Sequence, residues 1–402
     1  MIEQLSNKAG VIEKLYSRLE EIYPELVNLR RDFHMYPELS HEEVKTPQKV
    51  ATYLTELGLE VKTEVGGRGV LGFLRGGKPG KTIALRADFD ALPIQDEKAV
   101  DYKSKIPGVM HACGHDLHTA ALLGVAKVLS EVKDQVHGTI VFLHQFAEET
   151  SPGGAEFMIR DGCLEGVDVI YGAHVMSQQP YGTVSVVEGY ASSAQDDFYI
   201  TVSGRGGHGS SPHETIDALV TGSQIVLNLQ QIVSRRVNPL KAAAVTVGSF
   251  TSGNTTNVIP DSASIKGTVR TYDEEVRKMI QVSMEKIVKS TCEAADATYD
   301  LKYVNDCPSI WNDPDETNRV LNVAKSIVGE ENIVPGVPMM GSEDFAYYQK
   351  EIPGVFFIVG GRNEELNATY PHHHPKFDVD ERSIKEIGKV FIGTVFDFLE
   401  EK

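Results

Sequence analysis

The apolar residues between Asn7 and Tyr36 recur at the spacing of an amphipathic helix, which predicts a helix that ends before Pro37. Beyond it, short apolar runs alternate with helical segments. The runs have the length of buried strands and are bounded by turn residues: GVLGFLRG, KTIALRAD, GTIVFLHQ and VDVIYGAHV. Helical segments follow Leu117 and span Gly154 to Arg160. This alternation predicts an α/β sheet domain.

A different order of elements occupies the stretch from Asp196 to Asn305. DFYITVSG, AAAVTVGSF, ASIKGTVRTY and ATYDLKYV have the pattern of strands, and Glu214 to Arg236 and Glu274 to Ala294 that of helices. The resulting order, β-α-β-β-α-β, is the split βαβ arrangement with a four-stranded antiparallel sheet.

After Trp311 the chain returns to helices and an apolar strand, GVFFIVGG, and Glu381 to Glu401 is predicted to be helical. We therefore expect a discontinuous first domain of residues 1–192 and 309–402, with an inserted domain of residues 193–308. A chain of 402 residues with 41% hydrophobic content can bury two separate cores.

The net charge of the chain limits the classes of partner that it can bind. The formal net charge of −18 disfavours nucleic acid and anionic membrane surfaces, which would repel the protein, and favours a small molecule or another protein. No apolar run reaches the length of a membrane span, and the opening MIEQLSNKAG lacks the layout of a signal peptide. With only four scattered cysteines, a cytoplasmic protein is expected.

The stretch MHACGHDLHTA contains three histidines, a cysteine and an aspartate, and it lies directly before an apolar helical pattern. Cys113 and His115 sit on the turn that enters this helix, where the helix dipole favours a thiolate. Both residues are therefore candidate metal ligands. A surface turn rich in histidine and capped by Asp116 explains this motif equally well when it is taken alone.

Three predicted strands deliver polar groups at their ends. Glu148 and Glu149 follow GTIVFLHQFA, His174 ends VDVIYGA, and Asp88 and Asp90 end KTIALRA. Two adjacent carboxylates at a buried strand end are costly unless they are neutralised or bound, so one can serve as a metal ligand and the other as a base. A lone histidine such as His174 is more often a satisfied core or loop residue.

A fourth segment, YPHHHPKFDVDE, places three successive histidines before a proline turn. Four segments thus present His, Cys or carboxylate groups where an α/β fold places its site. The mixed donors suit Zn²⁺ best, with Mn²⁺, Co²⁺ and Ni²⁺ as further candidates. There are more donors than one tetrahedral ion needs, which suggests a pair of ions about 3.5–4 Å apart.

The motifs MHACGHD, QFAEE, GAHV and HHHPKFDVDE, in this order, resemble the M20 metallopeptidases. The resemblance is to their amidohydrolase branch, which includes hippurate hydrolases, plant auxin-conjugate hydrolases and bacterial N-acyl-amino-acid deacylases (aminoacylases). It covers nearly the whole chain. It implies a zinc-peptidase-like catalytic domain interrupted by a ferredoxin-like domain that forms a homodimer and acts as a lid.

The resemblance also implies roles for single residues. Glu148 falls on the family's general base. Asp88 and Asp90 stand where other branches have His-x-Asp, so they are expected to support ligands rather than to bind metal. The implied ligands of two divalent ions are Cys113, His115, Glu149, His174 and His373, the last chosen because His373, Pro375 and Phe377 match a His-x-Pro-x-Phe pattern.

In the inserted domain, SGRGGHGSSPH resembles the segment whose histidine, His208, reaches the scissile carbonyl, commonly in the neighbouring subunit's site. Asn257 and Arg270 fall where the family holds the substrate carboxylate, and an Arg suits that task through its bidentate fork. The simpler alternative for Arg270 is an exposed strand residue paired with Asp273. MGSEDFAYY, beginning near Gly341, resembles the loop that borders the acyl pocket, whereas TSPGGA after QFAEE departs from the family's glycine run.

These features predict a metal-dependent amidohydrolase that cleaves N-acyl amino acids, acetyl, benzoyl or similar, with Glu148 as the base. A dipeptidase or carboxypeptidase using the same site is the nearest alternative, and a carbamoylase is a variant of it. A protein that binds metal or acyl amino acids without catalysis is the alternative from another class. The presence of Glu148, which coordinates nothing in the expected site, disfavours that last interpretation.

Overall fold

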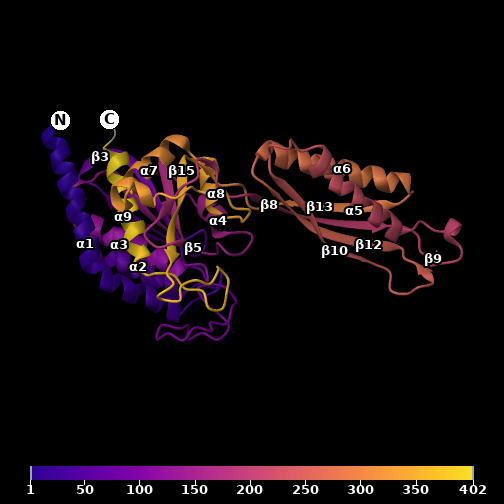
Figure 1. Cartoon of the computed structure of the whole chain (residues 1–402), viewed down its shortest axis with the longest axis horizontal. Helices are drawn as coiled ribbons and strands as arrows, with labels where there is room; N and C mark the ends of the chain where they lie inside the picture. Colours follow the sequence, from indigo (N-terminus) through magenta and orange to yellow (C-terminus); the bar gives the residue numbers. More distant parts are fainter. Residues whose placement is uncertain (1, 401–402) are drawn as a thin grey trace. The chain divides into compact units, whose positions relative to one another are not determined.

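The computed structural model describes residues 2–400 of the chain, with side chains described from residue 10 onward (Figure 1). The chain divides into two compact units. The first comprises residues 1–191, 311–337 and 344–402, and the second residues 192–310 and 338–343. The short segment 338–343, which the sequence pattern does not single out, belongs with the second unit.

A seven-stranded mixed sheet forms the centre of the first unit. Its strand order is β1-β2-β4-β3-β5-β15-β6, and β4, β3, β5 and β15 run parallel in its middle. Such strands are buried on both sides, which explains their almost uninterrupted apolar sequences. The bounds are Glu60–Val65 (β1), Gly69–Arg75 (β2), Lys78–Asp88 (β3), His137–Gln145 (β4), Val169–Pro180 (β5), Val184–Ser185 (β6) and Gly354–Arg362 (β15).

Helices complete the first unit. Four of them pack against one another and bury a common core: α1 (Ile2–Met35), α3 (His115–Ser130), α7 (Pro314–Val328) and α9 (Ser383–Leu399). α2 (Lys45–Glu56) packs against β1 and β2, while α4 (Gly154–Arg160) contacts α8 (Phe345–Glu351). A two-stranded ladder joins β7 (Gly189–Tyr190) to β14 (Trp311–Asn312). Together with the sheet, these helices confirm the predicted mixed α/β class.

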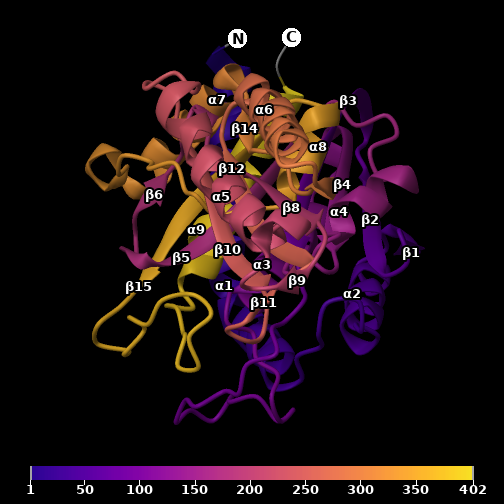
Figure 2. The same cartoon turned by 90° about the vertical axis from the view of Figure 1, so that its right-hand side faces the viewer.

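The second unit contains the predicted β-α-β-β-α-β order. Its four-stranded antiparallel sheet has the order β10-β12-β8-β13, and α5 and α6 lie side by side on it around a separate apolar core (Figure 2). A small ladder of β9 (Gly207–His208) and β11 (Val258–Ile259) lies beyond one end of the sheet. The remaining bounds are Ala194–Ser203 (β8), Ala218–Arg235 (α5), Ala243–Ser252 (β10), Ser262–Thr271 (β12), Glu274–Ala294 (α6) and Thr298–Asn305 (β13).

The predicted helix from Glu214 begins four residues later, at Ala218. Asp217 is the N-cap, because its carboxylate accepts hydrogen bonds from the backbone N–H groups of Leu219 and Val220. The residues before it form a separate 3₁₀ turn, Pro212–Glu214. An apolar pattern alone does not reveal this cap, whereas Asp273 caps α6 at the predicted start.

Candidate metal centre

The ends of the parallel strands bring four predicted ligands together in the first unit. Cys113 and His115 enter α3, Glu149 follows β4, and His174 lies in β5. Cys113 Sγ is 3.3 Å from His174 Nε2, and His115 Nε2 is 3.8 Å from Glu149 Oε1. Donor atoms of Cys113, His115 and Glu149 all lie within 4.8 Å of one another, close enough to share an ion.

Gly114 makes the turn between the first two ligands. Its φ of 97° lies in the left-handed region, and a Cβ there would come within 2.4 Å of Val175 Cγ1. Glycine is therefore required twice, for the backbone conformation and for the close approach of β5. Through this turn, Cys113 and His115 both face the same space.

Hydrogen bonds determine which nitrogens of two histidines can bind a metal. His115 Nδ1 lies 3.0 Å from the backbone oxygen and from Oδ1 of Asp90, and His174 Nδ1 lies 2.8 Å from the backbone oxygen of Val175. These oxygens only accept, so in the neutral ring each Nδ1 carries the proton and each Nε2 presents a lone pair. Metal-binding histidines are commonly held in this way.

The donors fit a cation. His115 Nε2 and Glu149 Oε1 are both buried, and neither has a hydrogen-bond partner among the described residues. Leaving two such atoms unpaired in a protein interior costs free energy unless an ion or a water binds them. Burial lowers the pKa of His115, but Asp88 and Asp90 outweigh it and raise that pKa to about 10. These negative surroundings favour a second proton on His115 Nε2, whose place a bound cation would take.

Asp88 and Asp90 form hydrogen bonds to histidines of the cluster. Asp90 accepts hydrogen bonds from His115 Nδ1, from Ser40 Oγ and from the backbone N–H of Glu149. Asp88 is bound by the buried guanidinium of Arg86 and by His118. Both carboxylates are therefore occupied with protein donors, as expected for groups that orient ligands.

His118 lies in the cluster but is not arranged as a ligand, and it was not among the predicted residues. The backbone N–H of Val175 donates to its Nε2 at 2.9 Å, so Nδ1 carries the proton and donates to Asp88 Oδ1 at 2.7 Å. Its helical position, three residues after His115, places it on the same face of α3, and that spacing could have indicated it.

The histidine tract contributes two residues. His373 Nε2 lies 3.3 Å from Glu149 Oε2, at the exposed edge of the cluster. His372 Nδ1 lies 3.6 Å from Cys113 Sγ, and with His174 these side chains form a second group of close donor atoms. The structure thus brings His372, which was not predicted either, next to the cysteine, and it places the predicted His373 beside Glu149.

Glu148 lies beside the cluster and is mostly buried, with 11% of its side chain exposed. Its Oε2 is 3.9 Å from His115 Nε2. The preceding residue, Ala147, has a left-handed backbone with φ 50°, and its N–H donates to the buried Glu43. The loop that carries Glu148 is therefore held by a specific side chain rather than left to solvent.

The surface-cap alternative for the MHACGHD motif is not what the structure shows. Asp116 is fully buried and is paired with Arg30 Nε at 2.8 Å and His34 Nδ1 at 2.7 Å. Arg30 in turn pairs with Asp378 Oδ1 at 3.0 Å. These ion pairs tie α1 and the segment after the histidine tract to the start of α3.

The predicted residues of the inserted domain lie at two ends of the second unit. The β9–β11 ladder joins the segments of His208 and Asn257, and Gly209 N–H donates to the backbone oxygen of Asn257 at 2.9 Å. Arg270 lies near the other end of β12, opposite Gln195. Gly341 accepts a hydrogen bond from Ser193 N–H through its backbone oxygen.

The simpler alternative for Arg270 was an ion pair with Asp273. Asp273 instead caps α6 and binds Lys241. Arg270 Nη1 is buried and has no hydrogen-bond partner in the described part of the chain.

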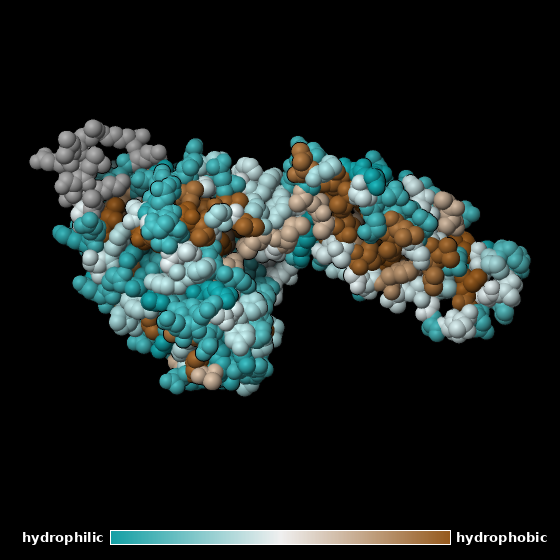
Figure 3. All heavy atoms as spheres, in the orientation of Figure 1, coloured by the Kyte–Doolittle hydropathy of each residue, from teal (hydrophilic) through white to brown (hydrophobic). Residues whose placement is uncertain are grey.

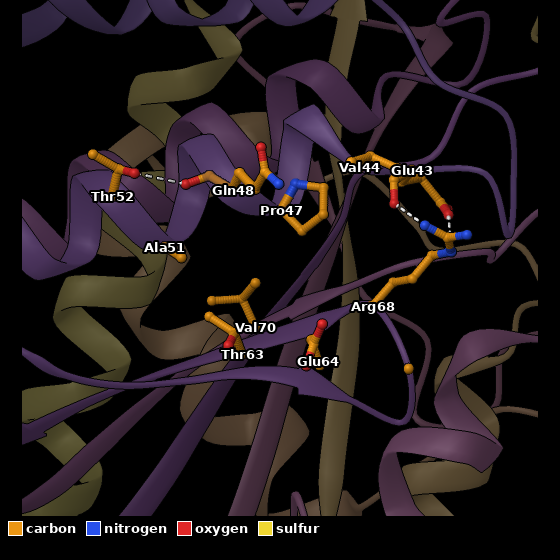
Figure 4. A pocket seen from close by; sticks show the side chains of 11 residues that line it. Glu43, Val44, Pro47, Gln48, Ala51, Thr52, Thr63, Glu64, Arg68 and Val70 are labelled. Carbon is orange, nitrogen blue, oxygen red and sulfur yellow. Dashed lines mark hydrogen bonds and ion pairs between the residues drawn. The ribbon is translucent and has the colours of Figure 1, made fainter.

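A cavity of about 610 Å³ lies between α2 and the β1–β2 hairpin (Figure 4). Arg68 donates to the backbone oxygen of Glu43 at its edge. Burial raises the pKa of Glu43 to about 8. None of the residues that line this cavity is a predicted site residue.

Comparison with known proteins identifies relatives along almost the entire chain. Residues 84–396 match the model of peptidase family M20/M25/M40. An N-acyl-L-amino acid amidohydrolase of Geobacillus stearothermophilus is 45% identical over 72% of this chain and 79% of its own length. Thermostable carboxypeptidase 1 of Saccharolobus solfataricus is 42% identical over 93% of this chain and 95% of its own.

A solved structure adds a similar fold. The Bacillus subtilis protein described as a dinuclear metal binding peptidase from the M20 family superposes with a TM-score of 0.81 and 34% identity, over 95% of this chain and 99% of that one.

No helix among the described residues is long and apolar enough to cross a membrane.

Proposed function

The chain belongs to peptidase family M20/M25/M40, and from this premise we propose that it is an amidohydrolase that releases amino acids from N-acyl amino acids. The observation that carries the proposal is the cluster of Cys113, His115, Glu149 and His174 with Glu148 beside it. The amidohydrolase named above supports the substrate class, because its identity extends over most of both chains.

The cluster is proposed to hold two divalent ions, Zn²⁺ or Mn²⁺ first and Co²⁺ or Ni²⁺ as further candidates. Cys113, His115 and Glu149 form one group of close donors, and Cys113 and His174 form a second. His373 is proposed as the fifth ligand, on the side of Glu149. When bound, such ions supply a more acidic water and polarise the scissile carbonyl.

Each remaining step is assigned to a protein side chain. Glu148 accepts a proton from the attacking water and later returns it to the nitrogen of the leaving amine. Its carboxylate suits both transfers because it lies beside the ligands and is not needed as one. His208 donates a hydrogen bond to the oxygen on which negative charge develops, and Asn257 helps to hold the substrate carboxylate.

Arg270 is proposed to select substrates with a free carboxylate, which its buried and unpartnered Nη1 can bind. Arg270→Gln should raise KM for N-acyl amino acids about ten-fold or more, because a charged hydrogen bond is lost, and kcat should change less. Steady-state kinetics measure this. The same substrates with a carboxamide in place of the carboxylate should respond little, and an equal loss on both series would contradict the assignment.

One chain cannot use His208 and Arg270 on the same small substrate. Eight residues of β12 separate Arg270 from Ser262, which is about 27 Å along a strand. β11 precedes Ser262 in the chain and pairs with β9, which contains His208. β9 lies beyond this end of the sheet (Figure 1). We propose that the protein is a homodimer and that the partner subunit's His208 and the partner subunit's Asn257 complete each site.

The second unit offers a surface for this dimer. β10 is an edge strand of its sheet, and its outer side can pair with a second copy. Apolar side chains gather on this unit (Figure 3), and the exposed ones on α5 and β10 include Leu219, Val220, Leu227 and Phe250, with Leu227 64% exposed. A second copy is the occupant that would also supply the missing histidine.

The second candidate function is a carboxypeptidase or dipeptidase, favoured by the carboxypeptidase relative. The same ligands, base and arginine would serve a peptide bond beside a terminal carboxylate. A non-catalytic binder remains the least favoured, because Glu148 would then have no task.

Chelator-stripped protein should be reloaded with Zn²⁺, Mn²⁺, Co²⁺ or Ni²⁺ and tested for amino-acid release from N-acetyl, N-benzoyl and N-carbamoyl amino acids and simple dipeptides. We expect metal-dependent release from the acyl substrates and none from the stripped protein. Release from dipeptides alone would replace the proposal with a peptidase. Metal binding without release from any of them would leave a binding protein.

A further inference from the structure

His372 and His174 flank the same sulfur but present opposite groups to it. The backbone N–H of Ser177 lies 3.2 Å from His372 Nε2, and a backbone N–H can only donate, so Nε2 must hold a lone pair. The proton of the neutral ring is then on Nδ1, which faces Cys113 Sγ at 3.6 Å. At the same sulfur, His174 presents a lone pair.

Whether a histidine presents a lone pair or an N–H to the cluster decides whether it can bind metal or can only donate a hydrogen bond to a ligand. A metal needs a lone pair, and His372 could offer one at Nδ1 only if its proton moved to Nε2, where it would face the N–H of Ser177. His373 meets no such conflict, because no N–H donor among the described residues holds its ring in one tautomer, and a cation beside the Glu149 carboxylate could replace a proton on its Nε2. His372 is thus suited to donate a hydrogen bond to the sulfur while His373 binds metal.

We propose that His372 is a positioning residue that donates Nδ1–H to the Cys113 thiolate and so orients this sulfur and tunes its bond to the metal. The inference rests on the proposed function, in which Cys113 is a metal ligand. A hydrogen bond to a ligating thiolate withdraws charge from the sulfur and restricts its direction. The donor comes from the same tract as the ligand His373, so one segment would set both.

The test is the sulfur-to-metal charge-transfer absorption of the Co²⁺-loaded protein, with Co²⁺ affinity measured by chelator competition. His372→Asn keeps an amide N–H near the position of Nδ1, and His372→Gln keeps an acceptor near the position of Nε2. His372→Leu removes both, and His374→Asn is the matched control in the same tract, because His374 stacks on Tyr370 and accepts from the backbone of Lys376.

We expect the absorption to move to longer wavelength in the Leu and Gln variants, since a sulfur without the donor gives up charge more easily. Co²⁺ affinity should fall about ten-fold in both. The Asn variant and the His374 control should resemble the parent protein. This pattern is not expected from a role in packing alone, because only the variants that lose the donor would shift.

Two results would overturn the inference about His372 and leave the proposed function intact. The first is an unchanged absorption in His372→Leu. The second is the loss of one Co²⁺ per chain in both the Asn and Leu variants, which would make His372 a ligand. A parent protein that binds Co²⁺ without any sulfur-to-cobalt absorption would instead refute Cys113 as a ligand, and with it this part of the proposed function.

Discussion

Glu148→Gln is expected to lower kcat by about 10²- to 10⁴-fold, because an amide of the same shape cannot accept the proton of the attacking water. Metal content should stay at the parent level, since Glu148 lies beside the ligand groups rather than among their proposed members. Substrate affinity should also persist. Metal analysis, steady-state kinetics and calorimetric titration with an N-acyl amino acid measure the three quantities separately.

The neighbouring residue provides the control. Glu149→Gln changes the same functional group one position along the chain, but Glu149 is the carboxylate that contacts His373 and lies near His115. It should lose metal affinity together with activity. Activity near the parent level in the Glu148 variant, or an equal loss of metal in both variants, would refute the assignment of Glu148 as the base.

A mixture of two inactive variants should regain activity if His208 acts in the neighbouring subunit's site. His208→Asn alone is expected to lose about 10²- to 10³-fold in kcat, the usual effect of removing one oxyanion donor. In a heterodimer with Glu148→Gln, one site combines an intact Glu148 with the partner subunit's intact His208. Random assembly would restore about a quarter of the sites. Activity after co-expression with two different affinity tags measures this.

Two controls test whether the regained activity comes from a site shared between two subunits. Glu148→Gln paired with Cys113→Ser should not regain activity, because both defects lie in the same unit and every site keeps one of them. The double variant Val220→Glu and Leu227→Glu should give monomers by size-exclusion chromatography and abolish the rescue. A fully active monomer would contradict the shared site, and so would the absence of rescue in stable heterodimers.

The apolar pattern was sufficient for most of the fold. α6 and α4 were predicted with the observed bounds, and the four strands of the second unit's sheet and five of the seven in the first unit's sheet lie where uninterrupted or alternating apolar runs predicted them, whereas β1 and β6 were not predicted. Buried parallel strands and amphipathic helices leave direct marks in a sequence, because burial requires apolar side chains at fixed spacing. Helix ends that depend on one cap, as at Asp217, leave weaker marks.

The position of the candidate site could be predicted from the sequence for a related reason. Carboxyl ends of neighbouring parallel strands meet at one edge of a sheet, so the apolar pattern alone predicts that Asp88, Glu149 and His174 lie near one another. The order of parallel strands, and therefore which ends are adjacent, was not determined by the pattern. Its observed order places β3 between β4 and β5.

The roles of the histidines required the tertiary structure. His115, His118, His174 and His372 have the same side chain, and only their neighbours distinguish lone pairs from N–H groups at the cluster. Those neighbours are backbone groups of Val175 and Ser177 and carboxylates of Asp88 and Asp90, most of them far from the histidines along the chain.

By itself, the sequence determined most of the elements, the α/β class and five candidate metal ligands, because these follow from composition, motifs and spacing along the chain. The tertiary structure alone decided which atoms point at one another: the unpaired His115 Nε2, the proton of His372 beside Cys113, and the separation of Arg270 from His208. Such features arise from contacts between distant segments, and a proton position follows the nearest donor or acceptor rather than the residue type.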